Sequence, residues 1–285
     1  MAIAIFGRLL QQPHLRHEWR FWIGVGLFAF ILAFSFLGPL VDHQSPFRLH
    51  LSAIDAPPSF RYPLGTDGLG RDELIRVMLG GRMILFVGMI SALGSTLLGM
   101  RVGWASAVTG RTGDMVGTWV MDVFLSVPQL VPILLIANLY RMDDVALVLV
   151  IGITSWPLVA RIVRAETLSL TERLYVEAAH SLGATNGGIM VRHILPNMAG
   201  TLLVAFRNTL GTTILVVAST SFLGFSLPPP APNWASMVAS SVSNMFGGYW
   251  WLMLFPGAAL MLVELSANLV ADAAHSVWSN QGGAV

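Results

Sequence analysis

Long apolar runs alternate with shorter polar connections along most of the chain. They lie near residues 21–40, 83–108, 115–140, 145–160, 199–225 and 249–271. A helix needs about 20 apolar residues to cross the hydrocarbon core of a bilayer, and most of these runs reach that length. The run at 145–160 is shorter, and Trp156 and Pro157 mark its end at the membrane interface. The pattern predicts an all-α membrane protein with six transmembrane helices.

A polar insert at 161–196 separates the fourth apolar run from the fifth. Its residues favour a helix over 156–182 that runs out of the membrane. Gly183 stands where a left-handed C-terminal cap belongs. Thr185 or Asn186 can cap a second short helix that ends near residue 195. We therefore expect a helix–turn–helix that is too polar to enter the bilayer and projects from it.

Two stripes at a spacing of four residues predict packing faces. In the second apolar run the stripe consists of small residues, which are Ser91, Ser95, Gly99, Gly103 and Ala107. Small residues allow two helix backbones to approach closely, either within this chain or against a second membrane subunit. In the insert, Leu170, Leu174 and Ala178 form an apolar face that fits a groove on a partner.

Composition narrows the chemistry that the chain can perform. Hydrophobic residues make up 55% of the 285 positions and charged residues only 11%, against about 25% in soluble domains. The absence of cysteine excludes disulfides, thiolate metal sites and cysteine nucleophiles, and the histidines lack metal-ligand spacing. All 16 basic residues are arginine, so a standard phosphate-binding P-loop, which requires lysine, is excluded. We assign no metal and no cofactor to this chain, and any ATP must be bound by another chain.

Arginine residues set the expected orientation. Arg8, Arg16 and Arg20 precede the first apolar run, which places the N-terminus in the cytoplasm by the positive-inside rule. No small-residue cleavage site follows this run, so we expect an uncleaved first span. Six spans then put both termini and the insert in the cytoplasm. The predicted segments are a cytoplasmic segment (1–20), a first span (21–40), an extracytoplasmic segment with an amphipathic helix (41–82), a five-helix core (83–275) containing the insert (161–196), and a cytoplasmic tail (276–285).

Three groups of motifs resemble those of a known family, from about residue 20 to residue 275. Gly65-Thr66-Asp67-x-x-Gly70-Arg71-Asp72, followed by Gly81-Arg82, resembles the signature of the C-type subunit of dipeptide, oligopeptide and nickel permeases. Glu177-Ala178-Ala179, Gly183 and Ile194-Leu195-Pro196 resemble the EAA loop of ABC importer permeases. Ser221 to Phe225, Asn233-Trp234 and Phe255-Pro256-Gly257 are similar to the last third of that subfamily. One departure is Ala271-Asp272-Ala273, where the family usually has a Gly-Asp pair.

The resemblance implies the type I fold of an ABC importer permease, a non-catalytic subunit of the bacterial inner membrane. The expected partners are a homologous B-type permease, two cytoplasmic ATPase subunits that bind ATP and Mg, and an extracytoplasmic substrate-binding protein. The expected cargo is a peptide, with nickel or a metal–chelator complex as the alternative. The resemblance assigns the coupling contact with an ATPase to Tyr175, Glu177, Ala178, Ala179, Gly183, Ile194, Leu195 and Pro196. The alternative is that Glu177 only solvates a connecting helix.

Two further sets of residues each allow two interpretations. The outer motif consists of Gly65, Thr66, Asp67, Gly70, Arg71 and Asp72. It predicts either a surface helix capped by Thr66 or Asp67, or a contact with the binding protein or the partner permease. The polar residues within apolar runs are Asp122, Arg207, Asn208 and Glu264. They predict either structural pairs, such as Glu264 with Arg207, or groups that line a translocation path.

Two other classes of protein share the apolar pattern. A secondary transporter would need no projecting helix–turn–helix and would use its intramembrane charges as an ion relay. A membrane anchor would transport nothing. The polar insert is the feature that separates these classes from an ATP-driven importer.

Overall fold

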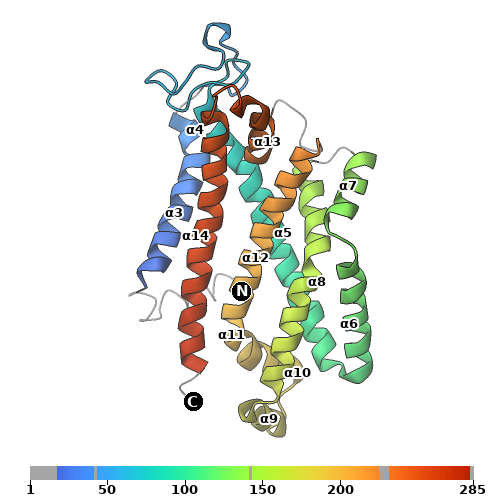
Figure 1. The fold of residues 1–285 in the computed structure, drawn as a ribbon. Coiled ribbons are helices and arrows are strands. Elements are labelled where there is room, and N and C mark those ends of the chain that lie inside the picture. Colours follow the sequence, from blue (N-terminus) through green and yellow to red (C-terminus); the bar gives the residue numbers. More distant parts are fainter. Residues whose placement is uncertain (1–17, 42–43, 141–142, 225–230, 283–285) are drawn as a thin grey trace.

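The computed structural model describes residues 18–41, 44–140, 143–224 and 231–282 (Figure 1). The regular structure in these ranges is helical, without a strand, and one isolated antiparallel bridge joins Thr66 to Asp72. The α-helices are α3 (Trp19–Phe36), α4 (Gly38–Val41), α5 (Glu73–Val108), α6 (Gly110–Ser126), α7 (Leu130–Leu139), α8 (Asp144–Thr171), α9 (Leu174–Ser181), α10 (Asn186–Ile189), α11 (Leu195–Asn197), α12 (Ala199–Phe222), α13 (Trp234–Met245) and α14 (Trp251–Gly282). A 3₁₀ turn, η1 (Leu51–Ala53), and a π-helical turn, η2 (Met190–Ile194), complete the described elements.

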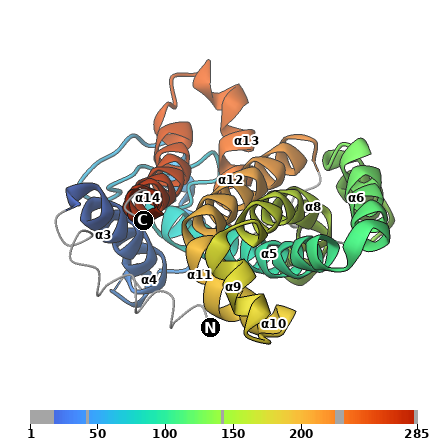
Figure 2. The ribbon, with the colours of Figure 1, turned by 90° about the horizontal axis from the view of Figure 1, so that it is seen from below.

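The predicted all-α membrane architecture is confirmed. Five helical segments are long and apolar enough to cross a bilayer, and they belong to α3 with α4, α5, α8, α12 and α14. The sixth candidate span is the pair α6 and α7, which is bent by 67°. In the bundle the two pieces lie at the opposite edge from α3 (Figures 1 and 2).

Several helix boundaries differ from those predicted. The second span begins at Glu73 rather than near residue 83, because the polar turn before it runs directly into α5. The third is broken before Leu130, since Pro128 has no N–H with which to continue the helix. The expected continuous helix over 156–182 is wrong, because α8 ends at Thr171 and Arg173 takes an extended conformation.

The chain ends also refine the predicted segments. α14 continues through Gly282, so most of the predicted tail at 276–285 is helical. Residues 1–17 lie outside the described residues, and with them most of the predicted N-terminal segment. The proline-rich stretch at 228–230 also lies outside them.

The small-residue stripe packs within this chain. Gly99 and Gly103 lie so close to α8 that a Cβ on Gly103 would be 2.3 Å from the carbonyl oxygen of Ala160. Ser91 and Ser95 are fully buried. Their hydroxyls donate to α8 carbonyls, with Oγ of Ser95 3.0 Å from the oxygen of Gly152. The stripe is therefore the seam between α5 and α8.

Trp234 joins two distant parts of the chain at the opposite end of the bundle from α9. The sequence pattern predicts an aromatic anchor at the membrane interface, but this side chain is completely buried. Its Nε1 donates to the carbonyl oxygen of Val77 at 2.6 Å. Gly81 makes room for the indole, since a Cβ there would lie 2.5 Å from the ring. The N-terminus of α13 is thus clamped to α5.

The close contact between α5 and α8 predicts opposite effects on thermal stability for alanine substitutions at two glycines of α5. Gly103→Ala should lower the thermal unfolding midpoint of the purified protein, because overpacking against backbone costs about 1–3 kcal/mol. The matched control is Gly94→Ala, since no atom lies within 4 Å of a Cβ built there. It should leave the midpoint unchanged or raise it, because alanine favours helix over glycine by about 1 kcal/mol. Equal shifts in the two variants would contradict the close approach.

Candidate functional site

The polar insert folds into a compact knob, which we define as residues 172–197, beneath α8 and α12 (Figure 1; Figure 2 shows it from below). Gly183 ends α9 with φ +82°, in the left-handed conformation. The N–H of Gly183 donates to the oxygen of His180 at 2.9 Å, and that of Ala184 to Ala179 at 3.1 Å. These two bonds form a Schellman cap. Oγ1 of Thr185 then accepts from the N–H of Gly188 at 3.2 Å, so both predicted caps are confirmed.

Buried side chains hold the knob against the bundle. They are Val176, Ile189, Met190, Ile194 and Leu195, and they form one cluster with Val159 and Val163 of α8 and Ala205 of α12. Ile194 and Leu195 are only 1% and 4% exposed. They therefore anchor the knob and do not offer a surface to another protein.

The outward side of the knob carries several uncovered residues. We define the knob surface as Leu174, Tyr175, Glu177, Ala178 and Leu182, all of which are exposed. Leu174 is 82% and Leu182 88% exposed, although both are fully apolar side chains. The predicted stripe is split, because Leu170 is buried while Leu174 faces away from the bundle. Leu182 went unpredicted, and its place just before the capping glycine is the signal that could have found it.

The other predicted knob residues differ in burial and in hydrogen bonding. The hydroxyl of Tyr175 accepts from Nδ2 of Asn197 at 3.4 Å, which links the start of α9 to α11. The same amide donates to the oxygen of His193 at 2.6 Å. Ala179 is half-buried against the anchoring cluster, whereas Pro196 is exposed. The knob is thus tied together at both of its ends.

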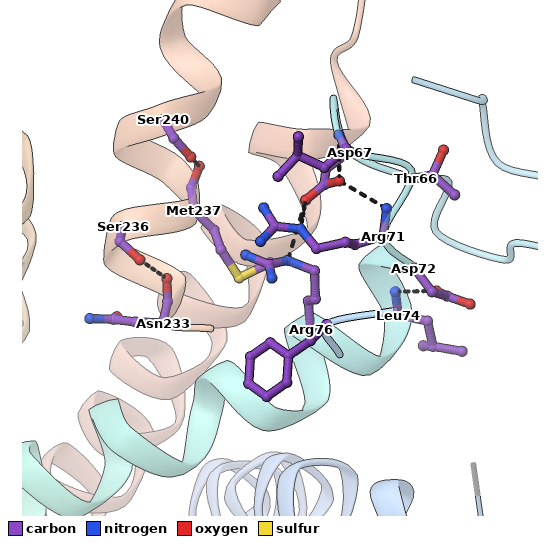
Figure 3. Close-up of polar contacts among 12 residues, drawn as sticks. Thr66, Asp67, Arg71, Asp72, Leu74, Arg76, Asn233, Ser236, Met237 and Ser240 are labelled. Carbon is purple, nitrogen blue, oxygen red and sulfur yellow. Dashed lines mark hydrogen bonds and ion pairs between the residues drawn. The ribbon is translucent and has the colours of Figure 1, made fainter. Parts of the chain in front are cut away.

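The outer motif forms a turn at the other end of the bundle, and Asp67 is its centre (Figure 3). Oδ1 of Asp67 accepts from the backbone N–H groups of Leu69 and Arg71, each at 2.9 Å. Oδ2 lies 2.7 Å from Nε of Arg71 and 3.6 Å from Nε of Arg76. One carboxylate therefore fixes both the backbone turn and two guanidinium groups.

Thr66 ties this turn to the preceding loop. Its side chain is completely buried. Oγ1 accepts from the N–H of Ala56 at 2.8 Å and donates to the oxygen of Ala53 at 2.5 Å. Gly70 has φ +71° and lies against the backbone of His50, where a Cβ would be 2.2 Å from the oxygen.

The predicted amphipathic surface helix is absent from the described residues 44–72. Asp72 caps α5 instead of Thr66 or Asp67, and its Oδ1 accepts from the N–H of Leu74 at 2.8 Å. Thr66 and Asp67 are unavailable as caps because they hold the loop and the turn. Gly65, at φ +81°, lies directly beneath Trp251 of α14. The outer motif is therefore built to join α5 to α14.

A cleft of about 330 Å³ lies between this turn and α13. Two of its charged residues, Glu73 and Arg76, are only 2% and 8% exposed. Nη1 of Arg76 has no hydrogen-bond partner among the described residues. The sequence did not predict a role for either residue. Both lie at the start of an apolar helix, where charged side chains are ordinarily expected to face solvent.

The polar residues within the candidate spans form two groups. Asp122 of α6 lies 2.5 Å from Nη2 of Arg161 of α8. One turn further along α8, Arg164 forms a two-bond pair with Asp114, with Nη2 2.6 Å from Oδ2. Both pairs join α6 to α8.

Arg207 of α12 belongs to the second group, and its predicted pairing with Glu264 is wrong. Its Nη1 lies 2.9 Å from Oδ1 of Asn268 and 3.3 Å from Oδ1 of Asp272. Its Nη2 donates to Oδ1 of Asn208 at 2.7 Å. Glu264 lies four residues before Asn268 on the same face of α14, with its carboxylate against Gly211. The guanidinium therefore pairs with the nearer Asp272.

Comparison with known proteins adds an independent result. Residues 95–277 match the family described as binding-protein-dependent transport system inner membrane component. A putative peptide permease protein of Brucella abortus biovar 1 (strain 9-941) is 36% identical over 235 residues, which cover 82% of this chain and 78% of that protein. A putative peptide transport system permease protein of the same strain is 34% identical over 269 residues, covering 94% and 90%. The oligopeptide transport system permease protein OppC of Bacillus subtilis (strain 168) is 29% identical over 250 residues, covering 88% and 82%.

The outer turn predicts a strict requirement for the hydroxyl at position 66. Thr66→Val keeps the shape but leaves the groups of Ala53 and Ala56 unpaired, which should cost about 1–3 kcal/mol. We expect a lower thermal unfolding midpoint and faster proteolysis between residues 44 and 72. Thr66→Ser retains the hydroxyl and should behave much more like the native protein. If valine is tolerated as well as serine, the two hydrogen bonds do not hold the loop.

Proposed function

The chain belongs to the family of binding-protein-dependent transport system inner membrane components, and from this premise we propose that it forms half of the pore of an ATP-driven peptide importer. The knob is the proposed contact with an ATPase. A homologous B-type permease would supply the other half of the pore. The permease itself performs no bond chemistry, and ATP and Mg are expected on the partner ATPase subunits.

The observation that supports this proposal most is the combination of a firmly anchored knob with two bare leucines. Leu174 and Leu182 are more than four-fifths exposed at the end of the bundle. Burial of a leucine side chain in an interface is favourable by about 1.5–3 kcal/mol. A partner groove that covers both residues would therefore gain a substantial share of its binding energy from them. Glu177 and Tyr175 flank them and supply polar contacts.

The anchoring of the knob explains how a push on it would reach the pore. Its buried residues share one cluster with Val159 and Val163 of α8 and Ala205 of α12. Tightly packed clusters move as units, because their cores resist compression. Displacement of the knob by the closing ATPases would therefore tilt α8 and α12 together. Such a movement is the basis of alternating access, in which the pore opens first to one side and then to the other.

The remaining parts of the proposal follow from the relatives and from the charge pattern. Peptides are the proposed cargo because the relatives are described as peptide and oligopeptide permeases. An extracytoplasmic binding protein would deliver the peptide. The proposed location is the bacterial inner membrane, with both termini and the knob in the cytoplasm. Nickel or a metal–chelator complex is the competing cargo in an uptake assay.

The knob surface can be tested with the double variant Leu174→Ser and Leu182→Ser. We expect the amount of ATPase that co-purifies with the permease to fall at least about tenfold, since each 1.4 kcal/mol of lost binding energy is a factor of 10. Peptide uptake and peptide-stimulated ATP hydrolysis in vesicles should fall with it. The control is Phe246→Ser, which removes a 95% exposed apolar residue from α13's end of the bundle. It should retain the ATPase.

Single changes at Glu177 and Gly183 complete the test. Gly183→Val is strained at φ +82° and should distort the cap, while Glu177→Ala removes an exposed charge without touching the fold. Uptake that is unchanged in both variants would overturn the coupling role. A purified transporter that imports peptides without any ATPase would be a secondary transporter instead. A chain that assembles but supports no uptake of any cargo would be an anchor.

A further inference from the structure

The break between α6 and α7 leaves irregular backbone in the middle of a candidate span. α6 ends at Ser126, Val127 is extended, and α7 begins at Leu130 after the 67° bend. Pro128 has no N–H, so the carbonyl of Phe124 loses its helical donor. The last carbonyls of a helix have no partner within it. The segment 124–127 therefore presents carbonyl oxygens that need hydrogen-bond donors.

A contact with α8 fixes the depth of this break. Nε2 of Gln129 donates to Oγ1 of Thr154 at 3.2 Å and to Oγ of Ser155 at 2.7 Å. These two residues lie 10 and 11 positions after Asp144, the first residue of α8. At 1.5 Å per residue they are about 16 Å along the helix. Half of a hydrocarbon core about 30 Å thick is a similar distance, so the break lies near the middle of the bilayer.

The break is not covered by the rest of this chain. Residues 122–128 are all exposed. Irregular backbone at membrane depth persists only where protein buries it or where it lines a water-filled cavity. Lipid is therefore excluded as its neighbour.

Ion pairs between α6 and α8 indicate that the break faces water rather than a dry protein interface. Beyond Gln129, the pair of Asp122 with Arg161 lies between α6 and α8, and both side chains are about half exposed, at 55% and 53%. Arg164 and Asp114 form a further pair closer to the knob. An exposed ion pair in a span is costly against hydrocarbon and marks an aqueous route. The break and the two pairs thus form a polar track from mid-membrane towards the knob.

We propose that segment 124–127 is a binding site for the backbone of the transported peptide, midway along the pore. Its carbonyl oxygens would accept from the N–H groups and the terminal ammonium of an extended peptide, as the edge of a strand does. Such a site binds the main chain of the peptide and makes no selection among its side chains. This inference rests on the proposed function, because it takes the cargo to be a peptide.

Cysteine accessibility tests the site directly, because the chain has no native cysteine. Ser126→Cys is introduced into the permease and assembled with its partner subunits in membrane vesicles. A water-soluble thiol reagent should label it at least about tenfold faster than a thiol held in lipid. The control is Phe30→Cys, a 59% exposed position in α3 at the far edge of the bundle. Tetra-alanine at about twice its Kd for this site leaves about one third of the sites free. It should therefore slow labelling of Ser126→Cys about threefold.

A second peptide tests the chemistry of recognition. Tetra-alanine methylated on its three amide nitrogens lacks the main-chain N–H donors and keeps only its terminal ammonium, so it should give clearly weaker protection at the same concentration. Labelling of Ser126→Cys no faster than that of Phe30→Cys, absence of protection by tetra-alanine, or equal protection by the methylated peptide would each overturn the site. Val127→Cys replaces the first variant if that one fails to assemble.

Uptake by the native transporter separates the two proposals. Normal import of labelled tetra-alanine together with an unprotected thiol overturns only the binding site. Absence of peptide import by the fully assembled native complex overturns the proposed cargo, and the site falls with it.

Discussion

The close backbone contact between α5 and α8 is the constraint on which the rest of the structure depends. Lipid tails are as apolar as leucine, so the hydrophobic effect does not drive two helices together inside a bilayer. Packing must do so, and the glycines at 99 and 103 allow α8 to approach until its carbonyls touch α5. α5 also contacts α3, α12 and α13. The seam thus provides one rigid pair around which the other helices are arranged.

The two ends of this rigid pair carry the two elaborated parts of the chain. At the start of α5, Asp72 caps the helix and Trp234 clamps α13 to it. At the end of α8, the anchoring cluster holds the knob. A displacement of the knob therefore need not be relayed through loops to be felt at the opposite end. The geometry suits a subunit that must link events on the two sides of a membrane.

Features with a local cause were predictable from the sequence, and features with a tertiary cause were not. The spans follow from apolar length, and the caps at Gly183 and Thr185 follow from residue types that favour those conformations. The burial of Trp234 depends on the glycines of α5, far away in the sequence. The pairing of Arg207 with Asp272 depends on how α12 and α14 cross. The break at Pro128 has a local cause in the missing N–H, but its exposure and its depth depend on the neighbouring helices.

A pore that carries many different peptides needs a site that holds each of them weakly. Three or four hydrogen bonds to backbone carbonyls, at about 1 kcal/mol each, give about 3–4 kcal/mol. That free energy corresponds to a dissociation constant of about 1 mM or weaker. Such a site orients an extended chain without trapping it, which is the condition for passage through any selective pore. Specific pockets for side chains would bind some peptides too tightly to release them. The main-chain acceptors that we propose at mid-membrane would satisfy the condition, and a proline break would expose them without placing a charge there.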